Sequence, residues 1–133
     1  MIEQVRVPIV NELGIVTARQ KGREISKKLL FNSVDQARIT TAISELARNI
    51  YLYAGNGEIL IEVIYSSGKT GLKITAADSG PGITDVRQAM QMGYTSSNGL
   101  GAGLPGVKRL MDEFSLETEP GKGTVITATK WIR

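Results

Sequence analysis

The placement of glycine is the feature of this chain that most constrains its fold. Among its 15 glycines are two short clusters, Asp78–Gly82 and Gly99–Gly103, in which glycine recurs at every second position. Glycine weakens both helices and strands, so neither cluster continues regular structure. The first cluster directly follows an apolar run that ends at Ala77, and the second directly precedes a helical pattern that begins at Leu104. We therefore expect one glycine turn at the end of a strand and one glycine loop at the entry to a helix.

The remaining pattern predicts a single α/β domain over residues 1–133. Gln4 to Val10 alternates apolar and polar residues, as a half-buried strand does, and Pro8 within it favours the edge of a sheet. Ser33 and Gln36 are typical of a capping box at a helix start. We expect a two-layer sandwich, with a mixed, mainly antiparallel sheet and helices packed on one face. The expected helices are residues 15–30, 33–53, 84–92 and 104–114, and the expected strands are 4–10, 58–65, 72–77 and 124–131.

The composition excludes several kinds of chemistry. The chain contains no cysteine and no histidine. Their absence removes disulfides, thiolate and histidine metal sites, thiol nucleophiles, histidine general bases and phosphohistidine steps. No apolar run is long enough to span a bilayer, and residues 1–10 do not form a signal peptide, so we expect a cytoplasmic protein with no membrane partner. The net charge of +3 arises within the first 49 residues and is too small by itself to indicate nucleic-acid binding.

Asp78 and the glycines after it form the first candidate ligand site. A carboxylate at a strand end can accept a hydrogen bond from an exocyclic amine, and Gly80 and Gly82 would let the backbone approach a flat ligand closely. The same five residues are also typical of a tight turn in which an aspartate accepts from a backbone N–H. Considered alone, this cluster is compatible with a ligand site and with a plain turn.

Gly99, Gly101 and Gly103 form the second candidate site. They stand directly before the helix expected from Leu104, where exposed N–H groups and the positive end of the helix dipole favour phosphates. The loop is not a Walker A loop, because no Gly-Lys-Ser/Thr follows, and no parallel βαβ unit precedes it as in a dinucleotide-binding fold. A hinge or a simple helix entry is the alternative interpretation.

Glu45 and Asn49 form the third candidate site, on the long helix expected from residue 33. They are four residues apart and so share one helical face. A carboxylate and an amide oxygen directed to one point could hold a Mg²⁺ ion with a water or hydroxyl beside it. An exposed, solvated pair on a helix surface is the alternative.

The order of these groups along the chain resembles the GHKL superfamily, the ATP-binding domain shared by gyrase, histidine kinases and MutL repair proteins. The matching segments are Glu45 and Asn49 for the N box, Asp78–Gly82 and Gly99–Gly103 for the two glycine boxes, and Gly123-Thr124 for the closing Gly-Thr element. The resemblance extends from about residue 15 to the end of the chain. It implies the Bergerat fold, with ATP and Mg²⁺ as cofactors.

The resemblance also implies a role for each candidate residue. Asn49 would bind Mg²⁺, and Glu45 would orient or deprotonate the hydroxyl that receives the phosphoryl group. Asp78 would accept a hydrogen bond from the adenine amine. The supporting positions would be Gly80 and Gly82 at the adenine ring, Thr124 acting through a water, and Gly99, Gly101 and Gly103 around the phosphates.

Within the superfamily, residues 36–51 and 99–114 are similar to the anti-sigma-factor kinases and their stressosome relatives. This similarity implies a serine/threonine kinase that phosphorylates STAS-domain stressosome proteins, leaves them and activates a PP2C-type phosphatase upstream of the general stress sigma factor. A histidine kinase is not indicated, because the chain has no histidine and Leu52 stands where those enzymes often have lysine. A nucleotide-gated anti-sigma factor that sequesters a sigma factor is the alternative function, and no nucleic-acid partner is expected.

Arg19, Arg23 and Lys27 recur every four residues and form a basic stripe on the first expected helix. A solvated helix face is one interpretation of this stripe. Because the first helix of related kinases takes part in docking, the resemblance implies a surface for an acidic STAS or phosphatase partner, away from the glycine loops. A homodimer is left open.

Overall fold

The computed structural model describes residues 4–82 and 103–132. Its elements, in chain order, are β1 (Gln4–Ile9), α1 (Glu12–Lys28), α2 (Ser33–Asn49), η1 (Ile50–Ala54), β2 (Gly57–Ser66), β3 (Lys69–Asp78), α4 (Leu104–Leu110), β4 (Glu113–Glu119) and β5 (Gly123–Trp131). The short η1 is a π-helix that continues α2. The helix expected over residues 84–92 lies outside the described residues.

The described strands form one five-stranded sheet with the order β1-β2-β3-β5-β4. All four pairings in it are antiparallel, so the described sheet lacks the parallel pair that a mixed sheet would contain. The strand β1 lies at an edge, as Pro8 predicts, because proline has no N–H to donate to a second neighbour. The β2–β3 hairpin turns at Ser67 and Gly68, whose φ angles of 53° and 78° suit a two-residue hairpin loop.

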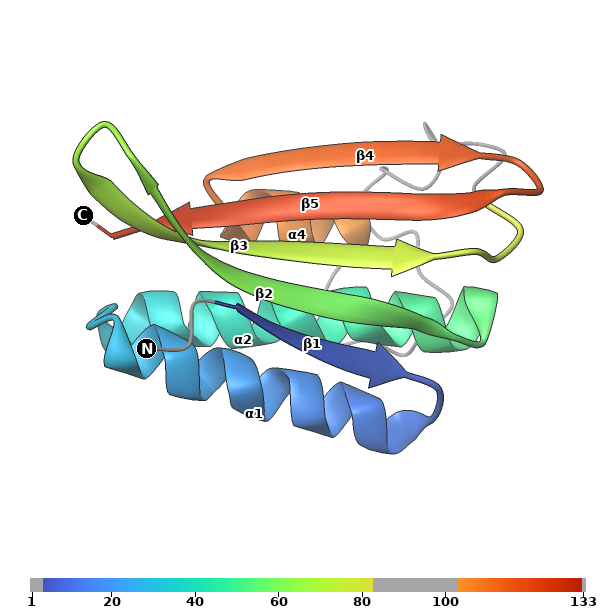
Figure 1. The fold of residues 1–133 in the computed structure, drawn as a ribbon, viewed down its shortest axis with the longest axis horizontal. Coiled ribbons are helices and arrows are strands. Elements are labelled where there is room, and N and C mark those ends of the chain that lie inside the picture. Colours follow the sequence, from blue (N-terminus) through green and yellow to red (C-terminus); the bar gives the residue numbers. More distant parts are fainter. Residues whose placement is uncertain (1–3, 83–102, 133) are drawn as a thin grey trace.

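The helices cover one face of this sheet, and the core lies between the two layers (Figure 1). The sheet contributes fully buried side chains such as Ile59, Ile61 and Ile74, which alternate along their strands with residues of the opposite face. Gly22 of α1 lies so close to Ile43 of α2 that a Cβ at residue 22 would meet the isoleucine side chain. The expected two-layer sandwich is confirmed.

The helix α2 begins at Ser33 as predicted, but its N-cap is one residue before the predicted Ser33. The N-cap is Asn32, whose backbone is extended and whose side chain accepts from the Asp35 N–H at 2.7 Å, whereas Ser33 is already helical. Gln36 does reach back as in a capping box, but it donates to the Phe31 carbonyl at 2.7 Å. The sequence thus predicts a side-chain cap at this helix start, and the structure assigns the cap to Asn32 and not to Ser33.

The helix predicted over residues 104–114 is too long, and the strand that follows it was not predicted. The helix α4 ends at Leu110, and β4 occupies Glu113–Glu119 at the free edge of the sheet. Half-buried Phe114 and Leu116 alternate with exposed polar residues along β4. This alternation is the signal that could have identified β4, and its three exposed glutamates are typical of a protected sheet edge.

Candidate nucleotide site

The strand ends of β3 and β5 bring Asp78 and Thr124 together. These two residues are direct partners across the antiparallel β3–β5 pair. The Asp78 Oδ1 atom accepts from the Gly80 N–H at 2.9 Å, and no described residue donates to its Oδ2. The Thr124 hydroxyl lies 2.9 Å from that of Thr118 on β4. The turn interpretation of Asp78 is therefore correct for one carboxylate oxygen, and no residue in the described ranges uses the other.

The first glycine cluster is held by the turn between β4 and β5. The Gly121 N–H donates to the Pro81 carbonyl at 2.7 Å. Gly82 has a φ of 76°, and a Cβ there would lie 2.5 Å from the Glu119 carbonyl oxygen. A Cβ at Gly80 would lie 2.6 Å from that of Ala54 in η1. The glycines are thus required for close packing of three backbone segments around Asp78.

The helix α2 carries Glu45 and Asn49 toward the same end of the sandwich. Glu45 is buried, with 3% of its surface exposed, and its Oε1 lies 3.9 Å from the Arg48 Nη1. Asn49 is half-buried at the last position of α2, and no described residue hydrogen-bonds its side chain. Because η1 continues from Asn49 and contacts Gly80 through Ala54, this end of α2 adjoins the Asp78 turn. The solvated-pair interpretation is wrong for Glu45, which is buried.

Gly103 is the one residue of the second glycine cluster that the structure describes. It is buried, has a φ of 67° and precedes α4, and its carbonyl accepts from the Val107 N–H at 3.2 Å. The predictions for Gly99 and Gly101 concern residues outside the described ranges. Gly103 therefore confirms a glycine entry to the helix, and the phosphate role of the cluster stays a prediction.

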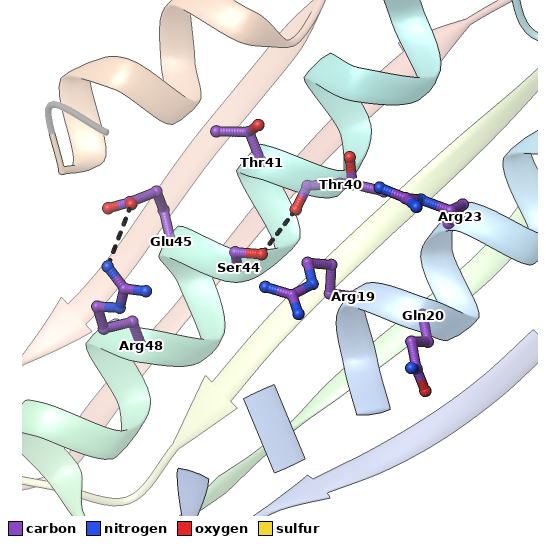
Figure 2. A pocket seen from close by; sticks show the side chains of 8 residues that line it. All are labelled: Arg19, Gln20, Arg23, Thr40, Thr41, Ser44, Glu45 and Arg48. Carbon is purple, nitrogen blue, oxygen red and sulfur yellow. Dashed lines mark hydrogen bonds and ion pairs between the residues drawn. The ribbon is translucent and has the colours of Figure 1, made fainter. Parts of the chain in front are cut away.

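Arg19 and Arg23 lie on a pocket that also contains Glu45. This pocket, of about 400 Å³, lies across the outer surface of α1 and α2, and Figure 2 shows Arg19 and Arg23 on the α1 side and Glu45 with Arg48 on the α2 side. Lys27 is exposed and does not line it. No described residue of the glycine clusters lines this pocket, and the two arginines share it with Glu45 because α1 and α2 pack side by side. Arg48, which the sequence analysis did not select, belongs to the same pocket.

The donor chemistry of this end fits a nucleotide and a magnesium ion. Asp78 offers a carboxylate oxygen at a strand end, and Asn49 offers an amide oxygen of the hard kind that Mg²⁺ prefers. The described residues contain no group of three or more histidine, cysteine, aspartate or glutamate side chains that could hold a metal by themselves. Such a site suits a Mg²⁺ ion carried in with phosphates, which needs few protein ligands.

A family model described as "Histidine kinase-like ATPase domain" matches residues 12–130. This chain belongs to that family. Its members are ATPase domains, so the family implies nucleotide binding, and the assignment of that binding to Asp78 and Asn49 stays a prediction. None of the helices in the described ranges is long and apolar enough to cross a membrane.

Two kinds of curated relatives within this ATPase family differ strongly in similarity. The serine/threonine-protein kinase RsbT of Bacillus subtilis (strain 168) is 63% identical over 133 residues, which is 100% of both chains. An anti-sigma F factor of Thermoanaerobacter sp. (strain X514) is 35% identical over 102 residues, which is 72% of this chain and 70% of that protein. The resemblance to the anti-sigma-factor kinases and their stressosome relatives is confirmed.

Solved structures support the fold. The RsbU and RsbW domains of Rv1364c from Mycobacterium tuberculosis match with a TM-score of 0.65 at 20% identity, over 97% of this chain and 32% of that one. This chain thus spans about a third of that structure. The SiaB–SiaC complex from Pseudomonas aeruginosa matches with a TM-score of 0.59 at 13% identity, over 97% of this chain and 89% of that one. The Bergerat-type fold predicted from the boxes is therefore confirmed.

Proposed function

We propose that this protein is an ATP-dependent serine/threonine protein kinase. The observation that carries the proposal is the 63% identity to a serine/threonine-protein kinase over the full length of both chains. The site is consistent with it, because Asp78, Asn49 and buried Glu45 lie toward one end of the sandwich. Phosphoryl transfer needs positioning and charge neutralisation more than covalent help from the protein, and this site offers both.

Four of the predicted site residues have a part in the proposed phosphoryl transfer. Bound ATP with Mg²⁺ supplies the phosphoryl group and much of the charge neutralisation. Asn49 would be a magnesium ligand, and Asp78 would accept from the adenine amine through the oxygen that does not bond the Gly80 N–H. Glu45 would accept the proton of the acceptor hydroxyl as that oxygen takes the γ-phosphoryl group, while the bond to the β-phosphate breaks and ADP leaves. Thr124, beside Asp78, supports the adenine end through a water.

The substrates we propose are STAS-domain stressosome proteins of the RsbS and RsbR type, and the second partner is a PP2C-type phosphatase. The kinase leaves its substrates after phosphorylating them and then activates the phosphatase in the general stress pathway of the cytoplasm. Arg19 and Arg23 are exposed beside the pocket that contains Glu45, which suits an acidic partner whose hydroxyl must reach that carboxylate. Lys27 extends this docking surface along α1, and a homodimer belongs to the same proposal.

A nucleotide-gated anti-sigma factor is the second candidate. The observation that favours it is the 35% identity to anti-sigma F factors over about 70% of each chain. The kinase is preferred because the relative named as a kinase is far more similar and is covered completely. Tight ATP-dependent retention of a sigma factor in a pull-down would favour the second candidate.

The test is transfer of label from [γ-³²P]ATP to a panel of STAS-domain proteins, with the parent and the Glu45→Gln variant. We expect the parent to label one of them, and Glu45→Gln to bind ATP normally while its transfer rate falls by about 10²–10⁴-fold, because an amide cannot take the proton. Glu24→Gln, an exposed glutamate of α1, is the matched control and should keep the parental rate. Absence of labelling by the parent would overturn the kinase, and equal rates in Glu45→Gln would remove Glu45 from its role.

A further inference from the structure

A lysine is buried on the helix-covered face of the sheet, at the end opposite to Asp78. Lys130, near the end of β5, is 5% exposed, and its Nζ donates to the Leu110 carbonyl at 2.9 Å. The same Nζ lies 3.7 Å from Oδ1 of Asp35 and 3.5 Å from Oδ1 of Asp112. Six residues along β5 separate Thr124 from Lys130, which is about 20 Å of extended strand. The lysine is therefore remote from any nucleotide at Asp78.

The partners of Lys130 are the ends of two helices that lead to the nucleotide site. Leu110 is the last residue of α4, and that helix begins directly after Gly103. Asp35 is in the first turn of α2, and the same helix carries Glu45 and Asn49 at its other end. One ammonium group thus contacts both helices, each at the end that is farther from the nucleotide site. Because α4 is about 10 Å long, a shift at Leu110 displaces Gly103 by nearly the same amount.

The two aspartates that pair with Lys130 also make hydrogen bonds of their own. Asp112 donates its N–H to the Thr129 carbonyl at 2.8 Å, and its Oδ2 accepts from the Trp131 N–H at 2.8 Å. Asp35 accepts from Arg38 at 2.9 Å on its own helix. Among these four side chains, the two carboxylates balance the charges of Lys130 and Arg38.

Buried ion pairs of this kind add little stability compared with apolar residues of the same size, because desolvation offsets their attraction. What this cluster does is connect elements: one Nζ group bonds the last residue of α4 and pairs with the first turn of α2. We propose that Lys130 is a positioning residue for the nucleotide site, which sets α4 and its Gly103 entry against the Glu45 and Asn49 end of α2. This inference rests on the proposed function for the nucleotide it serves.

The test compares ATP affinity in Lys130→Met with that in the parent, measured by calorimetry well below the melting temperature of each protein. Lys73→Met is the matched control, because Lys73 is half-buried on the opposite face of the sheet, next to the register pair of Lys130. Should Lys130→Met not fold, Lys130→Met combined with Asp112→Asn restores the charge balance and replaces it. We expect ATP affinity to fall by about tenfold or more in the Lys130 variants and to stay parental in Lys73→Met, since small displacements at a reactive site are costly. Lys130→Arg, which keeps the charge and donors, should recover part of the affinity.

Amide hydrogen exchange without nucleotide supplies an independent readout, and we expect residues 104–110 to exchange faster in Lys130→Met only. A lower melting temperature with parental ATP affinity would make the cluster purely structural and would overturn the inference. If residues 104–110 exchange at the parental rate in Lys130→Met, the inference is overturned as well. Failure of the parent to bind ATP is a separate result, which would overturn the proposed kinase and with it any nucleotide site for Lys130 to position.

Discussion

The two ends of the sandwich solve the problem of close packing in opposite ways. Where β3 ends and β5 begins, glycines let backbone segments meet, as Gly82 does with the Glu119 carbonyl and Gly123 with the Asp78 carbonyl. Where β5 ends, buried charges meet instead, with Lys130 between two aspartates and a helix end. The first end keeps polar atoms available, and the second satisfies its charges internally.

This difference teaches where a nucleotide can bind. A ligand with many polar groups needs backbone access and hydrogen-bond acceptors, and the glycine end has such acceptors at Asp78 and Asn49 that no described residue uses. A cluster of mutually satisfied charges offers no such acceptors but holds the attached elements in one arrangement. The molecule thus separates the binding of the nucleotide from the fixing of the helices that bind it.

The largest expected effect is that of Gly123→Ala. Gly123 has a φ of 125°, and a Cβ there would overlap the Asp78 carbonyl oxygen. The variant should lose about 3 kcal/mol of unfolding free energy, which lowers Tm by roughly 10 °C in a domain of this size. Gly121→Ala is the control, because its φ of 82° is also positive but its Cβ would meet nothing within 4 Å. It should lose only about 1 kcal/mol. Equal losses by thermal denaturation would show that crowding at Asp78 is not what requires Gly123.

Asp78→Asn should have an intermediate effect, confined to binding. Asparagine keeps an oxygen to accept from the Gly80 N–H, so the turn and Tm are preserved. Its amide group can present a donor to the adenine amine, and loss of that pairing should weaken ATP binding by about 1–3 kcal/mol in calorimetry. Glu117→Gln, an exposed carboxylate on β4, should leave ATP affinity unchanged. Parental affinity in Asp78→Asn would reduce Asp78 to a turn residue.

The smallest effect is expected from reversing the charges of two arginines on α1, which belong to neither end of the sandwich. Arg19→Glu with Arg23→Glu should leave ATP affinity intact and weaken a STAS or phosphatase complex by about tenfold at low salt, mainly through slower association. Lys21→Glu with Lys28→Glu makes the same change in charge elsewhere on α1 and should have less effect. Binding is measured over a salt series. Identical affinities of both double variants would make the arginines a solvated helix face.

Much of the fold followed from local pattern, and the errors occurred where two elements meet. Alternation identified β1, and the turn after Tyr65 identified the β2–β3 hairpin, since these signals involve neighbouring residues. The strand β4 was missed because five of its seven residues are polar and its partner β5 comes later in the chain. The cap was placed one residue late because Asn32 and Ser33 are both good caps, and only the backbone angle distinguishes them.

The sequence by itself determined which residues are candidates for binding a nucleotide. Helical spacing places Glu45 and Asn49 on one face, and the glycine cluster after Ala77 ends a strand, whatever the rest of the chain does. Only the tertiary structure decided that Asp78 faces Thr124, that Arg19 shares a pocket with Glu45, and that Lys130 is buried between two helix ends. These contacts depend on strand register and helix packing, which arise from elements distant in the chain and from the burial of the whole apolar face at once.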